Sequence, residues 1–230
     1  MILLRWLLLL LIIVALLFTV RFDDAVTASH LARADEFRAT YLYRQAADHV
    51  RVAATRQPWN ATLQLRLAQL MRLQRDFDQA AAMLDQAQRL GADPIELAAE
   101  RARLAEAQGN YAAAAAQWQI AAEARPGDAL APRRLIDAQL RAGNLEAAQA
   151  AAQRHKDRLD QAQLMLGKLQ AIDDPNAARA HFAQAIGDEA AGYLAVLDQP
   201  DAALRQLLLG RLYLSSGDLA LARRAFESAA

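Results

Sequence analysis

An almost wholly apolar stretch, Ile2–Val20, opens the chain and precedes a longer region of regularly spaced small and large apolar positions. Arg5 and Arg21 bracket this stretch, and the sixteen helical steps between them correspond to roughly 24 Å of rise. Because arginine stems snorkel and Trp6 suits the interface, this length is compatible with a bilayer core of about 30 Å. The pattern predicts a transmembrane anchor in residues 1–22, with a helix spanning residues 2–21.

A cleaved signal sequence is the alternative interpretation, with small residues for cleavage at 26–28. We favour the uncleaved anchor, because Arg21 and two aspartates lie between the apolar stretch and that site. Arginine far outnumbers lysine, which is typical of GC-rich bacterial genomes, so the expected location is a bacterial inner membrane, crossed once. The short N-terminal tail is typical of signal anchors and favours an extracytoplasmic domain, although positive charge after the stretch favours the opposite orientation.

Apolar positions then recur every 34 residues. An aromatic residue or leucine comes first and an alanine three residues later, in the pairs Tyr43/Ala46, Phe77/Ala80, Tyr111/Ala114 and Leu145/Ala148. Further apolar residues four positions after each alanine give each of these helices one apolar face. A single helical hairpin cannot bury such a face, so neighbouring hairpins must stack. Gly109-Asn110 and Gly143-Asn144 fit a left-handed helix end followed by a residue that caps the next helix.

This spacing resembles the tetratricopeptide repeat, a pair of antiparallel helices with small residues at fixed positions. The C-terminal repeat matches most closely, with Gly210, Tyr213, Gly217-Asp218-Leu219 and Ala222. The resemblance implies an all-α fold, a right-handed superhelical α-solenoid following the N-terminal transmembrane helix. It divides residues 23–158 into repeats at about 27–60, 61–94, 95–128 and 129–158, followed by a degenerate repeat at 159–200 and a C-terminal repeat at 201–230.

The register breaks in the degenerate repeat. The next marker position holds the charged Arg179, and the pattern fits better from Pro175, four residues earlier. The distance from Pro175 to Leu219 exceeds one period by ten residues, which predicts an insertion at 187–200 with a short helix around 193–197. Such an insertion would bend or tighten the array; simple decay of the repeat explains the pattern equally well.

Composition and motifs argue against catalysis. The 26 basic and 26 acidic residues cancel, which disfavours a nucleic-acid partner, and the absence of cysteine excludes thiolate chemistry. The four histidines show no metal-ligand spacing, and neither a glycine-rich phosphate loop nor a Walker lysine is present. We therefore expect no catalytic residues, no metal site, no cofactor and no small-molecule substrate.

What remains is a surface for protein or peptide partners. In tetratricopeptide proteins the first helix of each repeat lines a groove, and the resemblance assigns that role here to Leu65, Gln69, Arg72, Glu96, Arg103, Glu106, Arg133, Asp137 and Arg141. The lysine and asparagine with which chaperone-tail binders of the family hold a carboxylate are absent from these positions. The predicted function is a non-enzymatic, membrane-anchored scaffold for envelope assembly, secretion or a chaperone-like accessory role. The alternative is a regulatory adaptor of a membrane-associated enzyme or export complex.

Overall fold

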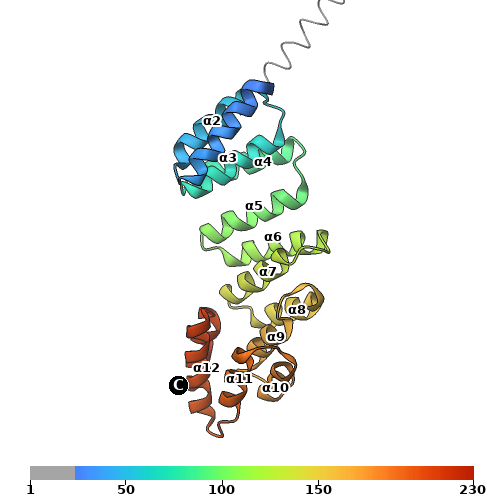
Figure 1. The fold of residues 1–230 in the computed structure, drawn as a ribbon, viewed down its shortest axis with the longest axis vertical. Helices are drawn as coiled ribbons and strands as arrows, with labels where there is room; N and C mark the ends of the chain where they lie inside the picture. The colour runs from blue at the N-terminus through green and yellow to red at the C-terminus, as the bar shows by residue number, and fades with distance from the viewer. Residues whose placement is uncertain (1–23) are drawn as a thin grey trace, which may run out of the picture. The chain divides into compact units, whose positions relative to one another are not determined.

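The computed structural model describes residues 24–230, and this range contains helices and connecting turns but no strand (Figure 1). The all-α prediction is therefore confirmed for the described chain. The predicted anchor, residues 2–21, lies outside the described residues. None of the helices that are described has the length and apolarity needed to cross a bilayer.

The chain forms two compact units, with a boundary between Glu100 and Arg101. The N-terminal unit contains helical residues 24–39, followed by α2 (Tyr43–Arg56), α3 (Ala61–Leu73) and α4 (Phe77–Arg89). The boundary falls within α5 (Pro94–Ala107). The C-terminal unit continues with α6 (Tyr111–Ala124), α7 (Leu130–Arg141), α8 (Leu145–Arg154), the short 3₁₀ helix η1 (Lys156–Arg158), α9 (Ala162–Gln170), α10 (Pro175–Gln184), α11 (Asp188–Leu197), α12 (Ala202–Ser216) and α13 (Leu219–Ala229).

The turn inside each hairpin has the same backbone geometry every 34 residues. Tyr41, Arg75, Gly109 and Gly143 all have positive φ, between 62° and 82°. The next residue donates its N–H to a carbonyl five positions earlier, as in Asp76 to Met71 and Asn110 to Ala105, each at 2.9 Å. This is the Schellman helix ending, which glycine adopts most easily. The Gly-Asn pattern predicted the turns at Gly109 and Gly143. The turns at Tyr41 and Arg75 contain no glycine and were not predicted from the sequence.

Small residues line the seams of the array. The alanines Ala46, Ala80, Ala114, Ala148 and Ala222 are all buried. Four pairs of positions sixteen residues apart combine a small and a larger buried side chain: Ala34 and Val50, Ala68 and Leu84, Ala102 and Trp118, Ile136 and Ala152. The last pair has the reverse order, with the larger residue on the first helix. Because cores pack at nearly crystalline density, a small residue in each pair leaves room for a larger one.

The aromatic and leucine markers of the period have mixed environments. Leu145 is buried, whereas Tyr43, Phe77 and Tyr111 are half-buried at the starts of their helices. Leu219, the marker of the C-terminal repeat, is 66% exposed. Four of the five markers are thus at least partly buried, and the fifth, Leu219, has its side chain in solvent.

Two glycines in the C-terminal unit allow a phenylalanine ring to approach the backbone. A Cβ atom built on Gly167 would lie 2.6 Å from the ring of Phe182, and one on Gly210 would lie 2.4 Å from the ring of Phe226. The helix pairs α9–α10 and α12–α13 are therefore packed by the same contact between a glycine and a phenylalanine ring. The extra helix α11 lies between them in the chain, within the stretch where the broken register placed an insertion. Gly167 was not recognised from the sequence, because the register shift obscured its position.

We expect two Gly→Ala substitutions in the C-terminal unit to have opposite effects. An added Cβ meets nothing within 4 Å at either Gly143 or Gly192, so backbone conformation decides the result. Gly143 has φ +82°, and Gly143→Ala should lower the free energy of unfolding by about 1–2 kcal/mol. Gly192 lies inside α11, and Gly192→Ala should raise it by about 0.5–1 kcal/mol.

Urea unfolding followed by circular dichroism checks this pair, and each variant is the control for the other. Equal midpoint shifts of the same sign would contradict the assigned turn geometry.

Candidate binding cleft

A cleft of about 860 Å³ opens within the C-terminal unit. One wall is α7, which contributes Arg133, Asp137 and Arg141, all three predicted groove residues. The other wall is the turn at 216–219 and helix α13, which lies against α7. The C-terminal hairpin thus returns to a helix more than 70 residues earlier in the chain, and the cleft lies between them.

Arginines surround a single carboxylate on the α7 wall. Desolvation raises the pKa of Asp137 above its usual value, and nearby Asp218 adds to the rise, although Arg133, Arg134 and Arg141 oppose it. The guanidinium of Arg141 lies 5.4 Å from the ring centroid of Tyr111, a cation–π contact. This wall therefore presents two arginines, Arg133 and Arg141, and one carboxylate to the cleft.

On the opposite wall, each arginine has an acidic partner. Arg223 pairs with Glu227 at 2.7 Å on the same helix, and Arg224 contacts Asp173 at 3.1 Å. These pairs are exposed, so each contributes little to stability. Their arginines line the cleft together with the exposed side chain of Leu219. Arg223 and Arg224 were not selected from the sequence, and Leu219 was selected only as a packing residue. The resemblance pointed to first helices as the groove, and α13 is a second helix.

A nearly buried lysine ties the cleft's far wall to the rest of the unit. The Lys168 side chain, 14% exposed, lies 2.6 Å from Glu189 of α11 and 2.9 Å from Asp218 of the α12–α13 turn. Burial alone would lower the pKa of Lys168, but hydrogen bonds to Glu189 and Asp218 outweigh it and raise that pKa. The hydroxyl of Tyr213 donates to the backbone oxygen of Lys168 at 2.6 Å. One side chain thus joins α9, α11 and the turn that lines the cleft.

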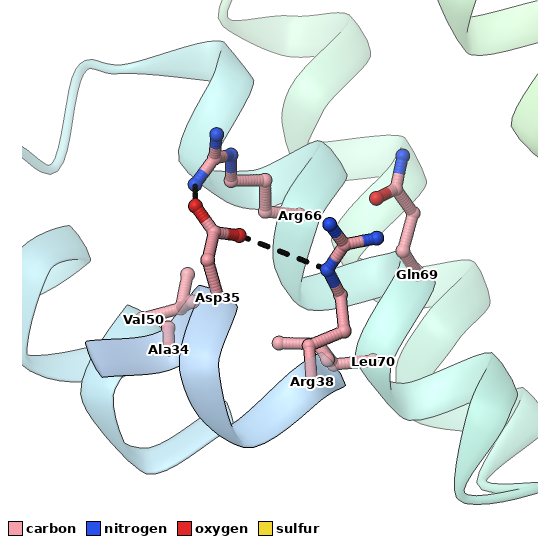
Figure 2. A pocket seen from close by; sticks show the side chains of 7 residues that line it. All are labelled: Ala34, Asp35, Arg38, Val50, Arg66, Gln69 and Leu70. Carbon is pink, nitrogen blue, oxygen red and sulfur yellow. Dashed lines mark ion pairs between the residues drawn. The ribbon is translucent and has the colours of Figure 1, made fainter. Parts of the chain in front are cut away.

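A smaller pocket of about 120 Å³ lies in the N-terminal unit (Figure 2). Asp35 lies between two arginines there, 3.7 Å from Arg38 of its own helix and 3.6 Å from Arg66 of α3. Gln69, a predicted groove residue, lines the same pocket beside the apolar Leu70. The two arginines already share a carboxylate, and the space holds little more than a few atoms.

The predicted groove residues of the N-terminal unit do not form a common binding surface. Leu65 is 4% exposed and belongs to the core, so it offers almost no surface to a ligand. Gln69 and Arg72 both contact the buried carboxylate of Glu100, at 3.1 and 3.6 Å. Glu96 is exposed on α5.

The remaining two predicted residues, Arg103 and Glu106, enclose an indole in the C-terminal unit. Arg103 lies 5.5 Å from the ring centroid of Trp118, and the indole N–H of Trp118 donates to Glu106 at 2.7 Å. These side chains are thereby held in place by a buried aromatic residue. Of the nine predicted groove residues, the structure brings only Arg133, Asp137 and Arg141 together in the large cleft.

The histidines have structural neighbours. Ring nitrogens of His30 and His49 lie 2.8 Å apart, and Phe37 stacks on His49. His155 is buried beside Arg158, and burial lowers the pKa of His155. Arg158 also donates to three backbone carbonyls, that of Ala122 in the last turn of α6 and those of Arg125 and Asp128 in the α6–α7 connection. Within residues 24–230, no group of three or more histidine or acidic side chains is arranged to hold a metal ion.

Comparison with known proteins identifies the fold. No family model matches the chain, and no curated protein matches its sequence. Among solved structures, Pseudomonas aeruginosa PilF aligns with 88% of this chain and 90% of its own, with a TM-score of 0.59 and 16% identity. A tetratricopeptide repeat protein from Parabacteroides merdae aligns with 89% of this chain and 92% of its own, with a TM-score of 0.57 and 15% identity.

A chain of the APC/C hetero-tetramer Cut9–Hcn1 also matches, over 88% of this chain and 39% of its own, with a TM-score of 0.52 and 15% identity. At such low identities the likeness concerns the fold. The chain has the tetratricopeptide repeat fold, and the prediction from the 34-residue spacing is confirmed at that level.

We expect Lys168→Met to destabilise the C-terminal unit. The change removes two charge-assisted hydrogen bonds and leaves two half-exposed carboxylates near an apolar group, which should lower the free energy of unfolding by about 2 kcal/mol. The matched control is Lys156→Met, the same change at the exposed position of the only other lysine in the chain. Urea denaturation measures both, and equal losses would show that the network has no special role.

Proposed function

We propose that this protein is a non-enzymatic scaffold that binds acidic segments of partner proteins in the cleft between α7 and α13. The tetratricopeptide fold supports a role in protein–protein interaction. Its stacked hairpins are expected to wind into a right-handed superhelix that presents such surfaces. We identify no catalytic cluster of side chains among the described residues, and a binding role does not require one.

The observation that carries this proposal is the placement of four arginines around one cleft, where they outnumber the three carboxylates of Asp137, Asp218 and Glu227. The arginines are Arg133 and Arg141 on α7 and Arg223 and Arg224 on α13. Guanidinium groups bind carboxylates through paired hydrogen bonds and keep their charge at all relevant pH values. Tyr111 and the exposed Leu219 add apolar contacts for neighbouring side chains of a peptide. An acidic segment with interspersed apolar residues therefore matches the cleft in both charge and polarity.

The scaffold is proposed to be held at a bacterial inner membrane by residues 2–21, a single span, with the repeats on the extracytoplasmic side. The apolar run and its flanking arginines support this location. An anchor confines the cleft to a thin layer at the membrane and raises its effective concentration for membrane-bound partners. A role in envelope assembly, secretion or assistance to translocated proteins fits this arrangement.

The double variant Arg133→Glu/Arg141→Glu should weaken binding of an acidic probe. With a fluorescent hexaglutamate peptide, anisotropy should show an affinity loss of about tenfold or more, since a hydrogen bond to a charged group contributes about 1.5–3 kcal/mol. The matched control, Arg211→Glu, reverses an exposed charge on α12 outside the cleft and should change affinity far less.

Circular dichroism should show unchanged helicity in both variants. Equal binding by the double variant and the unmodified protein, or an equal loss in Arg211→Glu, would contradict the cleft as the binding site.

Membrane topology gives an independent expectation. Alkaline phosphatase fused after Ala230 should be active in cells, because that enzyme folds only outside the cytoplasm, while green fluorescent protein at the same position should remain dark. Reversed results would place the repeats in the cytoplasm and favour the regulatory adaptor.

A further inference from the structure

The turn between α2 and α3 lies beside the first described residue. The side-chain amide of Gln57 donates to the carboxylate of Asp24 at 3.1 Å. Asp24 follows Arg21, the end of the proposed span, by three residues. Because three residues reach at most about 11 Å, Asp24 must lie close to the membrane surface if the anchor spans the bilayer.

This turn is held in one conformation by several hydrogen bonds. Asn60 donates its side-chain amide to Gln57 Oε1 at 2.9 Å and accepts from the backbone N–H of Thr62 at 3.1 Å. The backbone N–H of Asn60 also donates to the carbonyl of Gln57 at 3.0 Å. Gln57 thus connects Asp24 with the cap of α3, so the turn keeps its place next to the start of the first hairpin.

Trp59 projects from this turn into solvent. Its exposed fraction is 70%, whereas Trp118, the other tryptophan among the described residues, is 2% exposed and has its N–H bonded to Glu106. A large indole combines an apolar ring with one hydrogen-bond donor, so it is most stable where one side is apolar and the other wet. The headgroup region of a bilayer is such an environment, and tryptophan is enriched there.

We propose that the α2–α3 turn is a second membrane contact, with the indole of Trp59 inserted among lipid headgroups beside the anchor. The inference rests on the proposed anchor. The headgroup layer on each side of the hydrocarbon core is about 5–8 Å thick. Trp59 lies two residues after Gln57, which is bonded to Asp24, so its indole projects from a turn that begins close to this layer. Trp6 lies at the opposite end of the apolar stretch. The two tryptophans thereby mark both interfaces, and Trp59 fixes the tilt of the first hairpin against the bilayer.

The opposite end of the same hairpin offers a control position. Tyr41 is 77% exposed and follows helical residues 24–39, so it lies about 24 Å from Asp24 along the helix axis. An aromatic ring at position 41 is as exposed as Trp59 but is turned away from the point where the anchor joins. Comparing a tryptophan at position 59 with one at position 41 therefore distinguishes insertion into the bilayer from simple exposure to solvent.

The test uses the full chain in vesicles of phosphatidylethanolamine and phosphatidylglycerol, with or without phosphatidylcholine brominated near its headgroup. Three chains are compared: Trp6→Phe, Trp6→Phe/Trp59→Phe, and the latter with Tyr41→Trp added. Trp118 contributes the same buried background to all three. Flotation of the unmodified chain with the vesicles reports the anchor separately.

The emission of Trp59, taken as the difference between the first two chains, should be blue-shifted and quenched several-fold more strongly by the brominated lipid than that of Tyr41→Trp. Equal quenching at both positions in floating chains would overturn the lipid contact, leave the anchor intact and assign Trp59 to a protein partner. Failure of the unmodified chain to float would overturn the anchor and, with it, this inference.

Discussion

The array depends on a steric constraint between the two helices of each hairpin, where one residue must be small so that the facing residue can be large. In the most extreme form the small residue is glycine, as where Phe182 packs on Gly167 and Phe226 on Gly210. Elsewhere a buried alanine stands sixteen positions before a larger buried side chain, and at Ile136 and Ala152 the order is reversed. Helices that approach this closely bury their seams without any covalent link, which explains how a chain without cysteine holds its shape.

The cleft follows from how the C-terminal repeat is attached. Helix α11 lies in the chain between two hairpins that pack by the same contact of a phenylalanine ring on a glycine. Lys168 binds Glu189 of this helix and Asp218 of the α12–α13 turn, and so connects the two. The C-terminal hairpin then lies against α7, and arginines from two distant segments face the same space. An ion network around a nearly buried lysine is a weak source of stability but a strong constraint on geometry, because Lys168 contacts both carboxylates at the same time.

Local sequence signals predicted those features that arise from short-range interactions. The period of 34, the seam alanines and the turns at Gly109 and Gly143 could be read directly, because helix periodicity and left-handed glycines are properties of neighbouring residues. The turns at Tyr41 and Arg75 could not, since these residues seldom adopt positive φ unless the surrounding hairpin requires it. The predicted groove residues have different surroundings: Arg133, Asp137 and Arg141 line the cleft, whereas Leu65 is buried and Arg103 packs on Trp118.

By itself, the sequence indicated a helical-hairpin repeat with a period of 34 residues and small residues in its seams, because both follow from spacing along one or two helices. Only the tertiary structure decided that the C-terminal hairpin faces α7, that Arg223 and Arg224 share a cleft with Arg133, and that Gln57 meets Asp24. These contacts join segments between about 30 and 90 residues apart. They depend on the angles at which successive hairpins pack, which arise from many side-chain contacts together and leave no periodic trace in the sequence.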